Sequence, residues 1–578
     1  MTVRFPAGPS HRVRRHIMVA LTLGMTGAMS ACSSSSLIPP PPIPTPSPPS
    51  TSSADPSPSP GAALSSISAT APGGAPTLSQ ATPQATDQIP RTEVVPIVTP
   101  VAERSAPTSA PQPSATLQAA TSQPPSEPPS PTPLTPAEPG VSVNEGQITL
   151  PTYPYRNFLR EEHDALYGMM VPHLDRAAYE ASAPAPSPQT YRTLVIENSY
   201  LRLTFLPELG GRLYSAVVKS TGQEVFYHNP VVKPSRYGPL LPIEDNWWLA
   251  VGGMEWAFPV PEHGYAWGLP WTYQITSTDQ GVTVTLRDST ELGRVRAEVQ
   301  VTLPAHSGVI SIRPRLVNAT NHTVPVQFWV NGVLAPGSPS IPLDLRISIP
   351  VNQVVVHSRG ETGWDVPGPG LAMPWPLVTN RDLSQYGQWA NHLGFFIPYM
   401  PATFMAIYNP GADLGIARII SPGQIAGHKV FAFGPNFSDR SYTDDGSQYI
   451  EMWGGANSGF WPENDLQLAP GGTVEWQEEW WPLAGLGGLV FANDHVAFNM
   501  LGSSTLRILG ARPGQVTLVL SAGEDELLRT SLALDPAQPI ELPLPAALET
   551  PLRIQFYGPS GDLIADYLTS QHTASNPQ

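Results

Sequence analysis

The sequence predicts an all-β protein, with a large two-sheet β domain followed by a smaller β-sandwich. Short segments rich in Val, Ile, Thr and aromatic residues recur between residues 146 and 570, and Gly, Pro, Asn or Asp bounds each one. This pattern is typical of strands separated by turns in a sandwich or barrel. Helical periodicity is weak in the same region, and the sequence has no repeat of fixed period.

Ten of these segments lie between residues 146 and 485, a length that suits one large two-sheet domain. They are residues 190–207, 282–290, 294–304, 308–320, 324–334, 345–357, 402–410, 415–422, 428–434 and 473–483. Residues 156–170 (RNFLREEHDALYGMM) have the spacing of a helix, which we expect ahead of the sheets.

A second β-rich block covers residues 490–570. Its strand-like segments are residues 505–523, 528–545 and 552–569. These segments predict a small immunoglobulin-like sandwich. Because the block contains no tryptophan, we expect a structural or docking role rather than a catalytic one.

The first 31 residues have the features of an export signal. Arginines and no acidic residues precede an apolar stretch at residues 17–31, which is too short for a comfortable membrane helix. The stretch ends in Met-Ser-Ala-Cys, which resembles the lipobox of bacterial lipoproteins, although Met29 stands where leucine is usual. That resemblance implies acylation of Cys32 and a lipid anchor on the extracytoplasmic face of the cell membrane. An ordinary signal peptide ending near a cysteine is the alternative.

Residues 32–143 read as a disordered linker. Much of the chain's total of 71 prolines lies here among Ser, Thr and Ala, without aromatic residues and with little charge. Such a segment cannot bury enough apolar surface to offset its chain entropy. We expect an extended stalk between the anchor and the folded domains.

Composition excludes several classes of function. The net charge of −16 argues against nucleic acid as a partner. Cys32 is the only cysteine, so the monomer has no disulfide and no cysteine-based zinc cluster. Phosphate-loop, zinc-protease and serine-hydrolase motifs are missing, and we expect neither a metal nor a cofactor.

Four motifs in the large domain resemble the galactose-mutarotase-like superfamily, and within it a bacterial domain family of unknown function. They are Gly-Gly-Arg within residues 203–230, GGMEWAFP with a later His-Gly at 252–264, GHKVFAFG at 427–434 and DDGSQYIEMWGG at 444–455. The stretch that follows, residues 468–483, is similar to the closing strands of aldose 1-epimerases. The resemblance implies a β-supersandwich over residues 146–485 and a sugar as ligand.

The resemblance also implies catalytic positions. Sugar mutarotation needs a base for the anomeric hydroxyl and an acid for the ring oxygen. Glu451 occupies the place of the epimerase base, but Asn331 falls where the acidic histidine is expected. Asn donates hydrogen bonds and does not release a proton at useful pH. Glu255 and His263 are then the candidates for the acid, with His428 behind them.

The stretch at residues 252–271 combines Glu255 and His263 with several large rings, and we expect it to line a sugar-binding cleft. A carboxylic acid walled by tryptophan would have a raised pKa and could protonate a glycosidic oxygen, with Glu451 as its partner. Glu255 could instead form a structural ion pair with Arg212, and His263 could cap a turn. The remaining candidate ligand-binding residues are Arg212, Asn331, Trp256, Trp267, Trp389, His428 and Trp453.

Three hypotheses follow from these observations. The first is a surface-anchored lipoprotein whose mutarotase-like domain binds or modifies a mono- or oligosaccharide. The second is a glycoside hydrolase or lyase that uses Glu451 and Glu255. The third is a non-catalytic module that contacts cell-wall polymers or proteins. All three depend on where Glu451, Glu255 and His263 lie relative to one another.

Overall fold

The computed structural model describes residues 140–238, 246–437, 440–544 and 551–569 of the 578-residue chain. The predicted signal segment, Cys32 and nearly all of the predicted linker lie outside the described residues. Within them the chain is mostly strand, which confirms the all-β prediction. None of the helices in the described ranges has the length and apolarity needed to cross a bilayer.

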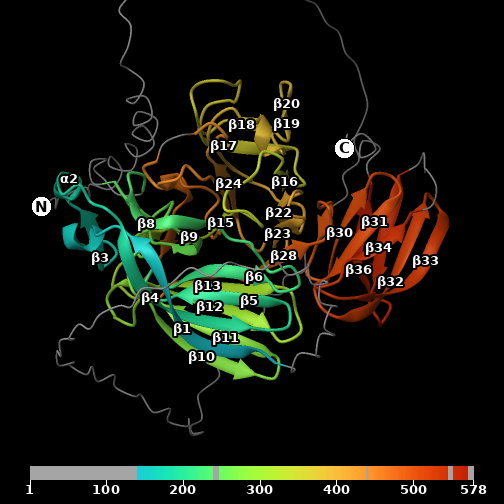
Figure 1. The fold of residues 1–578 in the computed structure, drawn as a ribbon, viewed down its shortest axis with the longest axis horizontal. Helices are drawn as coiled ribbons and strands as arrows, with labels where there is room; N and C mark the ends of the chain where they lie inside the picture. Colours follow the sequence, from blue (N-terminus) through green and yellow to red (C-terminus); the bar gives the residue numbers. More distant parts are fainter. Residues whose placement is uncertain (1–139, 239–245, 438–439, 545–550, 570–578) are drawn as a thin grey trace, which may run out of the picture. The chain divides into compact units, whose positions relative to one another are not determined.

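In the described part of the chain, the larger of two main sheets has thirteen strands, several of which are labelled in Figure 1. It contains most of the candidate site residues. In spatial order its strands are β18 (Ala372–Pro374), β17 (Gln353–Arg359), β21 (Leu393–Phe396), β24 (Gly427–Ala432), β25 (Ile450–Gly455), β15 (Trp329–Leu334), β9 (Trp248–Ala257), β8 (His228–Ser235), β1 (Ser142–Thr152), β4 (Ser187–Glu197), β5 (Leu201–Leu206), β6 (Arg212–Val218) and β7 (Gln223–Glu224). β1 begins at Ser142, so it includes the last two residues of the predicted linker.

Among the described residues, the second main sheet has nine strands, of which β10 to β13 lie side by side in Figure 1. In spatial order they are β10 (Thr272–Thr278), β11 (Gly281–Arg287), β12 (Val295–Pro304), β13 (Ile310–Asn318), β28 (Glu478–Ala484), β23 (Leu414–Ile419), β22 (Phe404–Asn409) and β16 (Arg346–Ser348), with β27 (Thr473–Glu475) also paired to β13. Buried and partly buried residues alternate strictly along β12, as expected for a strand with one face on the core.

The two main sheets pack face to face. On the larger sheet, the row His428–Gly454–Val330–Trp256 runs across four neighbouring strands and therefore lies on one face. A Cβ on Gly454 would meet the Arg418 guanidinium of the second sheet, so this face points to the interior. Arg418 and Glu478 form an ion pair there at 2.7 Å, with both side chains fully buried. The opposite face of the larger sheet carries the candidate site.

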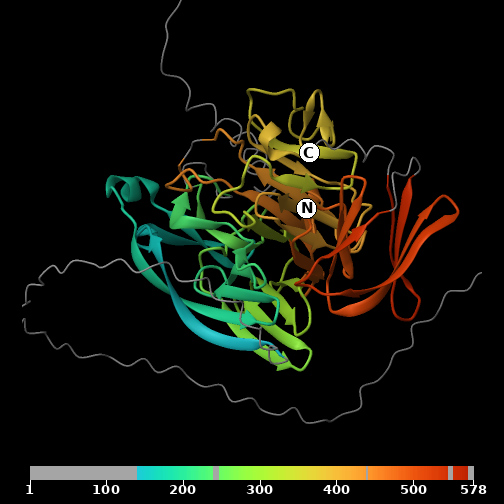
Figure 2. The same cartoon turned by 45° about the vertical axis from the view of Figure 1, so that its right-hand side comes forward.

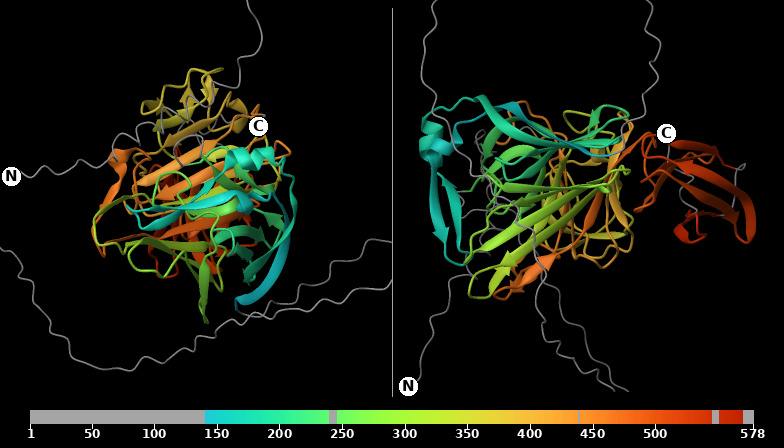
Figure 3. Two further views of the ribbon diagram at one scale, coloured as in Figure 1. Left: turned by 90° about the vertical axis from the view of Figure 1, so that its left-hand side faces the viewer. Right: turned by 90° about the horizontal axis from the view of Figure 1, so that it is seen from below.

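Short elements complete the described part of the large domain. The paired strands are β2 (Leu159–Asp164) with β3 (Met169–Leu174), β14 (Val324–Val326) with β26 (Leu466–Leu468), and β19 (Leu377–Val378) with β20 (Arg381–Asp382). The helices are α2 (Arg176–Ala181) and the 3-10 turns η1 (Tyr155–Phe158), η3 (Tyr386–Gln388) and η4 (Pro462–Asn464). Figure 3 shows α2 directly after the β2–β3 hairpin.

The helix predicted over residues 156–170 is wrong. The structure places η1 and the β2–β3 hairpin there. Asp164 Oδ1 accepts hydrogen bonds from the backbone N–H groups of Leu166 and Tyr167, and Gly168 takes a φ of +67°. This is turn chemistry, because a side-chain acceptor and a left-handed glycine compete with a helix. The pairing of β2 with β3 therefore determines the local structure, in spite of the helical spacing of the apolar residues.

The C-terminal block forms two four-stranded antiparallel sheets, coloured orange to red in Figure 2. One contains β29 (Phe491–Ala492), β30 (Val496–Leu501), β31 (Thr505–Gly510) and β34 (Ile540–Pro543); the other contains β33 (Asp525–Leu534), β32 (Gly514–Ala522), β35 (Leu552–Tyr557) and β36 (Leu563–Leu568). Apolar residues from both sheets share one core, which makes this block a β-sandwich, as predicted.

Candidate functional site

One row of side chains across the larger sheet defines the candidate site. Lys429 pairs with Trp453, Trp453 with Asn331, and Asn331 with Glu255, on the neighbouring strands β24, β25, β15 and β9. Paired residues point to the same face of a sheet, so all four lie on the face away from the second sheet. Glu451 is two residues before Trp453 on β25 and shares this face.

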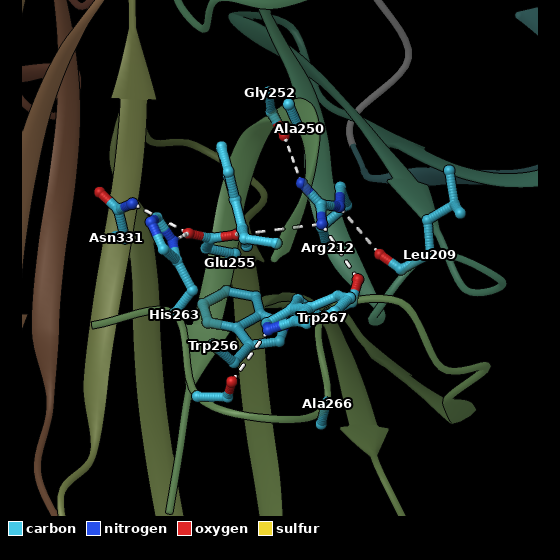
Figure 4. A network of polar contacts seen from close by, with 12 residues as sticks. Leu209, Arg212, Ala250, Gly252, Glu255, Trp256, His263, Ala266, Trp267 and Asn331 are labelled. Atoms are coloured by element: carbon cyan, nitrogen blue, oxygen red, sulfur yellow. Dashed lines mark hydrogen bonds and ion pairs between the residues drawn. The ribbon is translucent and has the colours of Figure 1, made fainter. Parts of the chain in front are cut away.

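Both oxygens of the Glu255 carboxylate accept hydrogen bonds, and Figure 4 shows this residue among its neighbours. Its Oε1 accepts hydrogen bonds from His263 Nδ1 at 2.5 Å and from Asn331 Nδ2 at 3.0 Å. Its Oε2 accepts one from Trp248 Nε1 at 3.0 Å. Both carboxylate oxygens are therefore occupied by groups of the protein itself, which suits a carboxylate that orients its neighbours.

Arg212 braces Glu255 from the side of β6. Its guanidinium donates hydrogen bonds to the carbonyl oxygens of Leu209, Gly252 and Trp267, and its Nη2 lies 3.9 Å from Glu255 Oε2 (Figure 4). The side chain is 1% exposed. Because its donors are used by carbonyls and Glu255, Arg212 acts as a structural brace. The ion pair considered from sequence is present alongside the other contacts of Glu255.

Two glycines allow β9 to carry Glu255 into this position. Gly252 and Gly253 have φ angles of +92° and +76°, in the left-handed region that favours glycine. A Cβ on Gly253 would lie 2.7 Å from the backbone oxygen of Leu213, and one on Gly252 would lie 2.1 Å from that of Tyr227. The Gly-Gly pair therefore permits the close approach of β9 to its neighbours just before Glu255.

His263 reaches the site from the loop that follows β9. Besides its bond to Glu255, its ring stacks on Trp248 with centroids 4.1 Å apart and lies 5.6 Å from the ring of Trp453. Its neighbour Glu262 has a φ of +61°, which is strained for a residue with a side chain. With Nδ1 engaged by Glu255, Nε2 is the imidazole nitrogen without a hydrogen-bond partner among the described residues.

Asn331 leaves one polar atom unused. Its Nδ2 donates to Glu255, but its Oδ1 is buried and has no hydrogen-bond partner among the described residues. A buried acceptor without a partner is uncommon and costs stability. It is the kind of atom that a ligand hydroxyl would satisfy.

Glu451 lies beside these groups and has a different environment. Its Oε2 accepts a hydrogen bond from Trp453 Nε1 at 2.9 Å. Burial raises the pKa of Glu451, although Lys429 and His263 oppose that effect. Burial also favours a high pKa at Glu255, but the charge and hydrogen bond of His263, with Arg212 and Asn331, outweigh it and hold the pKa of Glu255 below its usual range. The pKa of Glu451 is therefore raised and that of Glu255 is lowered, which separates the pKa values of the two carboxyl groups.

His263 completes this electrostatic arrangement. Burial lowers the pKa of a histidine, but the charge and hydrogen bond of Glu255, with smaller contributions from Glu451 and Glu262, raise the pKa of His263. The site therefore holds a carboxylate that stays ionised, an imidazole that favours its protonated form and a carboxyl group that ionises less readily than usual.

The site is closely covered. Glu255 is 2% exposed and Glu451 is 4% exposed, whereas the His263 side chain retains 11%. Glu262, beside it, is also partly exposed. His263 and Glu262 are therefore more exposed than Glu255 and Glu451.

A family model describes most of the large domain. The match covers residues 170–483, more than half of the chain, and the family is a domain of unknown function (DUF5107). The chain belongs to this family. The resemblance to a family of unknown function, seen in the sequence motifs, is thereby confirmed, and all the site residues above lie inside the family domain.

Solved structures show distant likeness. A TPR-domain containing protein from Parabacteroides distasonis is 21% identical, with a TM-score of 0.48 over 61% of this chain and 56% of its own length. A galactose mutarotase-like protein from Clostridium acetobutylicum is 12% identical, with a TM-score of 0.33 over 51% of this chain and 96% of its own. A putative aldose 1-epimerase from Escherichia coli K12 is 13% identical, with a TM-score of 0.33 over 50% and 98%.

Four predicted ligand-binding residues either lie away from the Glu255–Glu451 cluster or have rings that are packed inside the domain. Trp256 lies on the interior face of the sheet and donates to Gly211 O. His428 lies on that face too, where its Nδ1 is 2.9 Å from Arg418 Nη1. Trp267 is 2% exposed and packs edge-on against Trp247. Trp389 is also 2% exposed and donates to Leu383 O. Trp453 is within the site, but is 1% exposed.

Two residues of the site, Lys429 and Trp248, were not predicted from the sequence. Lys429 lies in the site row, next to His428, which was chosen instead. Trp248 holds both Glu255 and His263. A signal for Lys429 was present, because a lysine inside the apolar strand GHKVFAFG is rarely buried without a reason. Only the register of β24 shows which of the two neighbouring residues faces the site.

Proposed function

We propose that this protein binds a sugar and performs acid–base chemistry at its ring, with His263 as general acid and Glu451 as general base. The observation that carries the proposal is that His263 and Asn331 both donate hydrogen bonds to the same oxygen of Glu255. An imidazole from the loop thus stands beside the strand position where Asn331 occurs. The histidine expected at that position from the epimerase resemblance is supplied from another part of the chain.

The chemistry follows from the charges. Protonated His263 would give its Nε2 proton to the ring oxygen, while Glu451 takes the proton of the anomeric hydroxyl. The ring bond then breaks and leaves an open-chain aldehyde, whose reclosure by the reverse proton transfers yields either anomer. A base whose pKa lies above the usual carboxylate range is better matched to neutral pH. Glu255 keeps the imidazole oriented and stabilises its charge.

The hydrolase alternative has less support. It requires Glu255 to act on a sugar or a water molecule, but its two oxygens accept three hydrogen bonds from His263, Asn331 and Trp248. A nucleophile or base needs a free lone pair aimed at the substrate. Release of reducing ends from a polysaccharide panel would revive this alternative. A binder without turnover would use the same contacts and show affinity alone.

We also propose that the domain is held at the cell surface. Acylation of Cys32 would anchor the chain, and the Pro-rich stretch after it would act as a spacer, at about 3.1 Å per residue where it is extended. Membrane fractionation of the wild-type chain against Cys32→Ala tests this point. Recovery of both chains in the same soluble fraction would contradict it.

The activity is tested with the purified full-length chain. Freshly dissolved α-glucose and α-galactose are followed by polarimetry with wild type, His263→Gln and Glu451→Gln. Loss of a general acid or base should slow the catalysed relaxation by about 10²- to 10⁴-fold. His495→Gln is the matched control, because this histidine lies in the C-terminal block with 46% of its side chain exposed. Relaxation no faster than in buffer with the wild type, for every aldose tried, would refute the catalytic proposal.

A further inference from the structure

Lys429 is a buried cation held by aromatic rings. Its Nζ lies 4.5 Å from the ring centroid of Trp453, 4.8 Å from that of Phe460 and 5.3 Å from that of Phe431. The residue is 3% exposed. Ring faces attract an ammonium group without using its hydrogen atoms. The three N–H donors of Lys429 therefore remain to be satisfied.

These donors have no hydrogen-bond partner among the described residues. Within the described ranges, no carboxylate oxygen lies within 4.0 Å of Lys429 Nζ and no hydrogen bond engages it. Burial lowers the pKa of Lys429, and the charges of Glu451 and Glu262, which make no contact with it, oppose that effect. Buried ammonium groups in proteins are normally paired, since an unpaired charge is costly away from water. An unpaired ammonium group on the face of a candidate site is a group that an oxyanion would satisfy.

A second unsatisfied group lies close to Lys429. His357 is the extra residue of a bulge between β17 and β21, and its Nδ1 is buried without a partner among the described residues. Its ring packs against Phe460 and Phe396, each with a centroid separation of 5.2 Å. Phe396 is paired with Lys429 on the neighbouring strand. Bulges commonly redirect a side chain beside a functional site.

Lys429 and the proposed catalytic residues all lie around the indole of Trp453. Trp453 has Lys429 over its ring and Glu451 at its Nε1, and the ring of His263 lies 5.6 Å from its own. Glu451 is paired with Phe431, two residues from Lys429, so Lys429 and Glu451 are diagonal neighbours on β24 and β25. Such neighbours are about 7–8 Å apart at the backbone, within reach of a common ligand for long side chains.

We propose that the sugar bound here is a uronic acid, free or as a residue of an acidic polysaccharide, whose carboxylate is recognised by Lys429 with His357 beside it. This rests on the proposed function. In a hexuronic acid the carboxylate is attached to the carbon next to the ring oxygen, so a group acting at the ring and a cation binding the carboxylate must be close together. Lys429, Glu451 and His263 around Trp453 meet that requirement. Asn331 Oδ1 then accepts from a ring hydroxyl.

The test compares acidic and neutral sugars on the full-length chain by isothermal titration calorimetry. The probes are galacturonate and glucuronate, galactose and glucose, and galactose 6-sulfate. Hydrogen bonds to charged groups predict that uronates bind about ten- to a hundredfold more tightly than the neutral sugars. Lys429→Met should abolish that preference, so that uronates bind no more tightly than the neutral sugars. Lys219→Met is the control, because Lys219 is paired with Glu197 at 2.5 Å.

Each contrary outcome has a distinct meaning. Equal affinity of wild type for uronates and neutral sugars would overturn the inference and leave the proposed function standing, with Lys429 as a structural lysine. A preference for the sulfate ester over both uronates would overturn the assignment to a carboxylate. Failure of every sugar to bind or turn over would overturn the proposed function and this inference together. The wild-type comparison does not depend on the folding of any variant.

Discussion

Replacement of His428 by glutamine should flatten the dependence of stability on pH. His428 is 4% exposed, and its Nδ1 lies 2.9 Å from Arg418 Nη1 on the interior face of the larger sheet. Since Arg418 can only donate, His428 must be neutral to accept this bond. Burial, reinforced by the charge of Arg418, lowers the pKa of His428 to about 3. Glutamine can accept the same bond but cannot be protonated.

The magnitude follows from proton linkage. In the unfolded chain a histidine has a pKa of about 6.5, so as pH falls the unfolded state takes up the proton first. The stability due to neutral His428 is complete above that value and is lost as pH falls toward 3. Between pH 7 and pH 5 the two pKa values give a loss of about 2 kcal/mol. His428→Gln should therefore lose about 2 kcal/mol less than wild type over this interval.

Urea unfolding followed by tryptophan fluorescence measures this difference. All 14 tryptophans lie between residues 247 and 481, so the signal reports on the large domain. His495→Gln is the control, since that histidine is exposed and lies outside the large domain. Equal losses of stability in wild type and His428→Gln between pH 7 and pH 5 would refute the claim that His428 is buried in its neutral form.

Three further predictions concern the site itself. Arg212→Met leaves Glu255 without its brace and three carbonyls without a donor, and should cost about 3–5 kcal/mol in urea unfolding; a loss below about 1 kcal/mol would contradict the buried position of this arginine. Gly253→Ala should destabilise by about 1–3 kcal/mol, because alanine is strained at a φ of +76°; wild-type stability would show that the backbone is not left-handed there. Glu255→Gln removes the main cause of the raised pKa of His263, which should fall in an NMR titration; an unchanged pKa would refute the contact.

Much of the fold could be predicted from the sequence because each strand carries its own signal. Residues 294–304 alternate between core-facing and outward-facing positions, and the structure has β12 over nearly the same range. Trp256 illustrates the limit of this reasoning. It looked like a sugar-stacking ring, yet alternation places it on the face opposite to Glu255, its immediate neighbour. The side to which either residue points depends on the partner strand.

The candidate site was predictable in part. Glu255, His263 and Glu451 were chosen from motifs, and the structure places them around Trp248 and Trp453. Local sequence could not show that Asn331 shares an oxygen of Glu255 with His263, because that depends on the register of β9 and β15 across about 76 residues of chain. The same holds for Lys429, which enters the row only through the pairing of β24 with β25.

Histidine-selective NMR of the full-length chain tests the central claim most directly. The Cε1–H resonances of His263 and His428 are assigned from the His263→Gln and His428→Gln variants, and galactose or galacturonate is then added. The ring of His263 lies at the proposed ligand and that of His428 on the interior face of the same sheet. The account predicts that a sugar which binds moves the His263 resonance and leaves that of His428 in place. Binding that shifts neither resonance, or only that of His428, would contradict it.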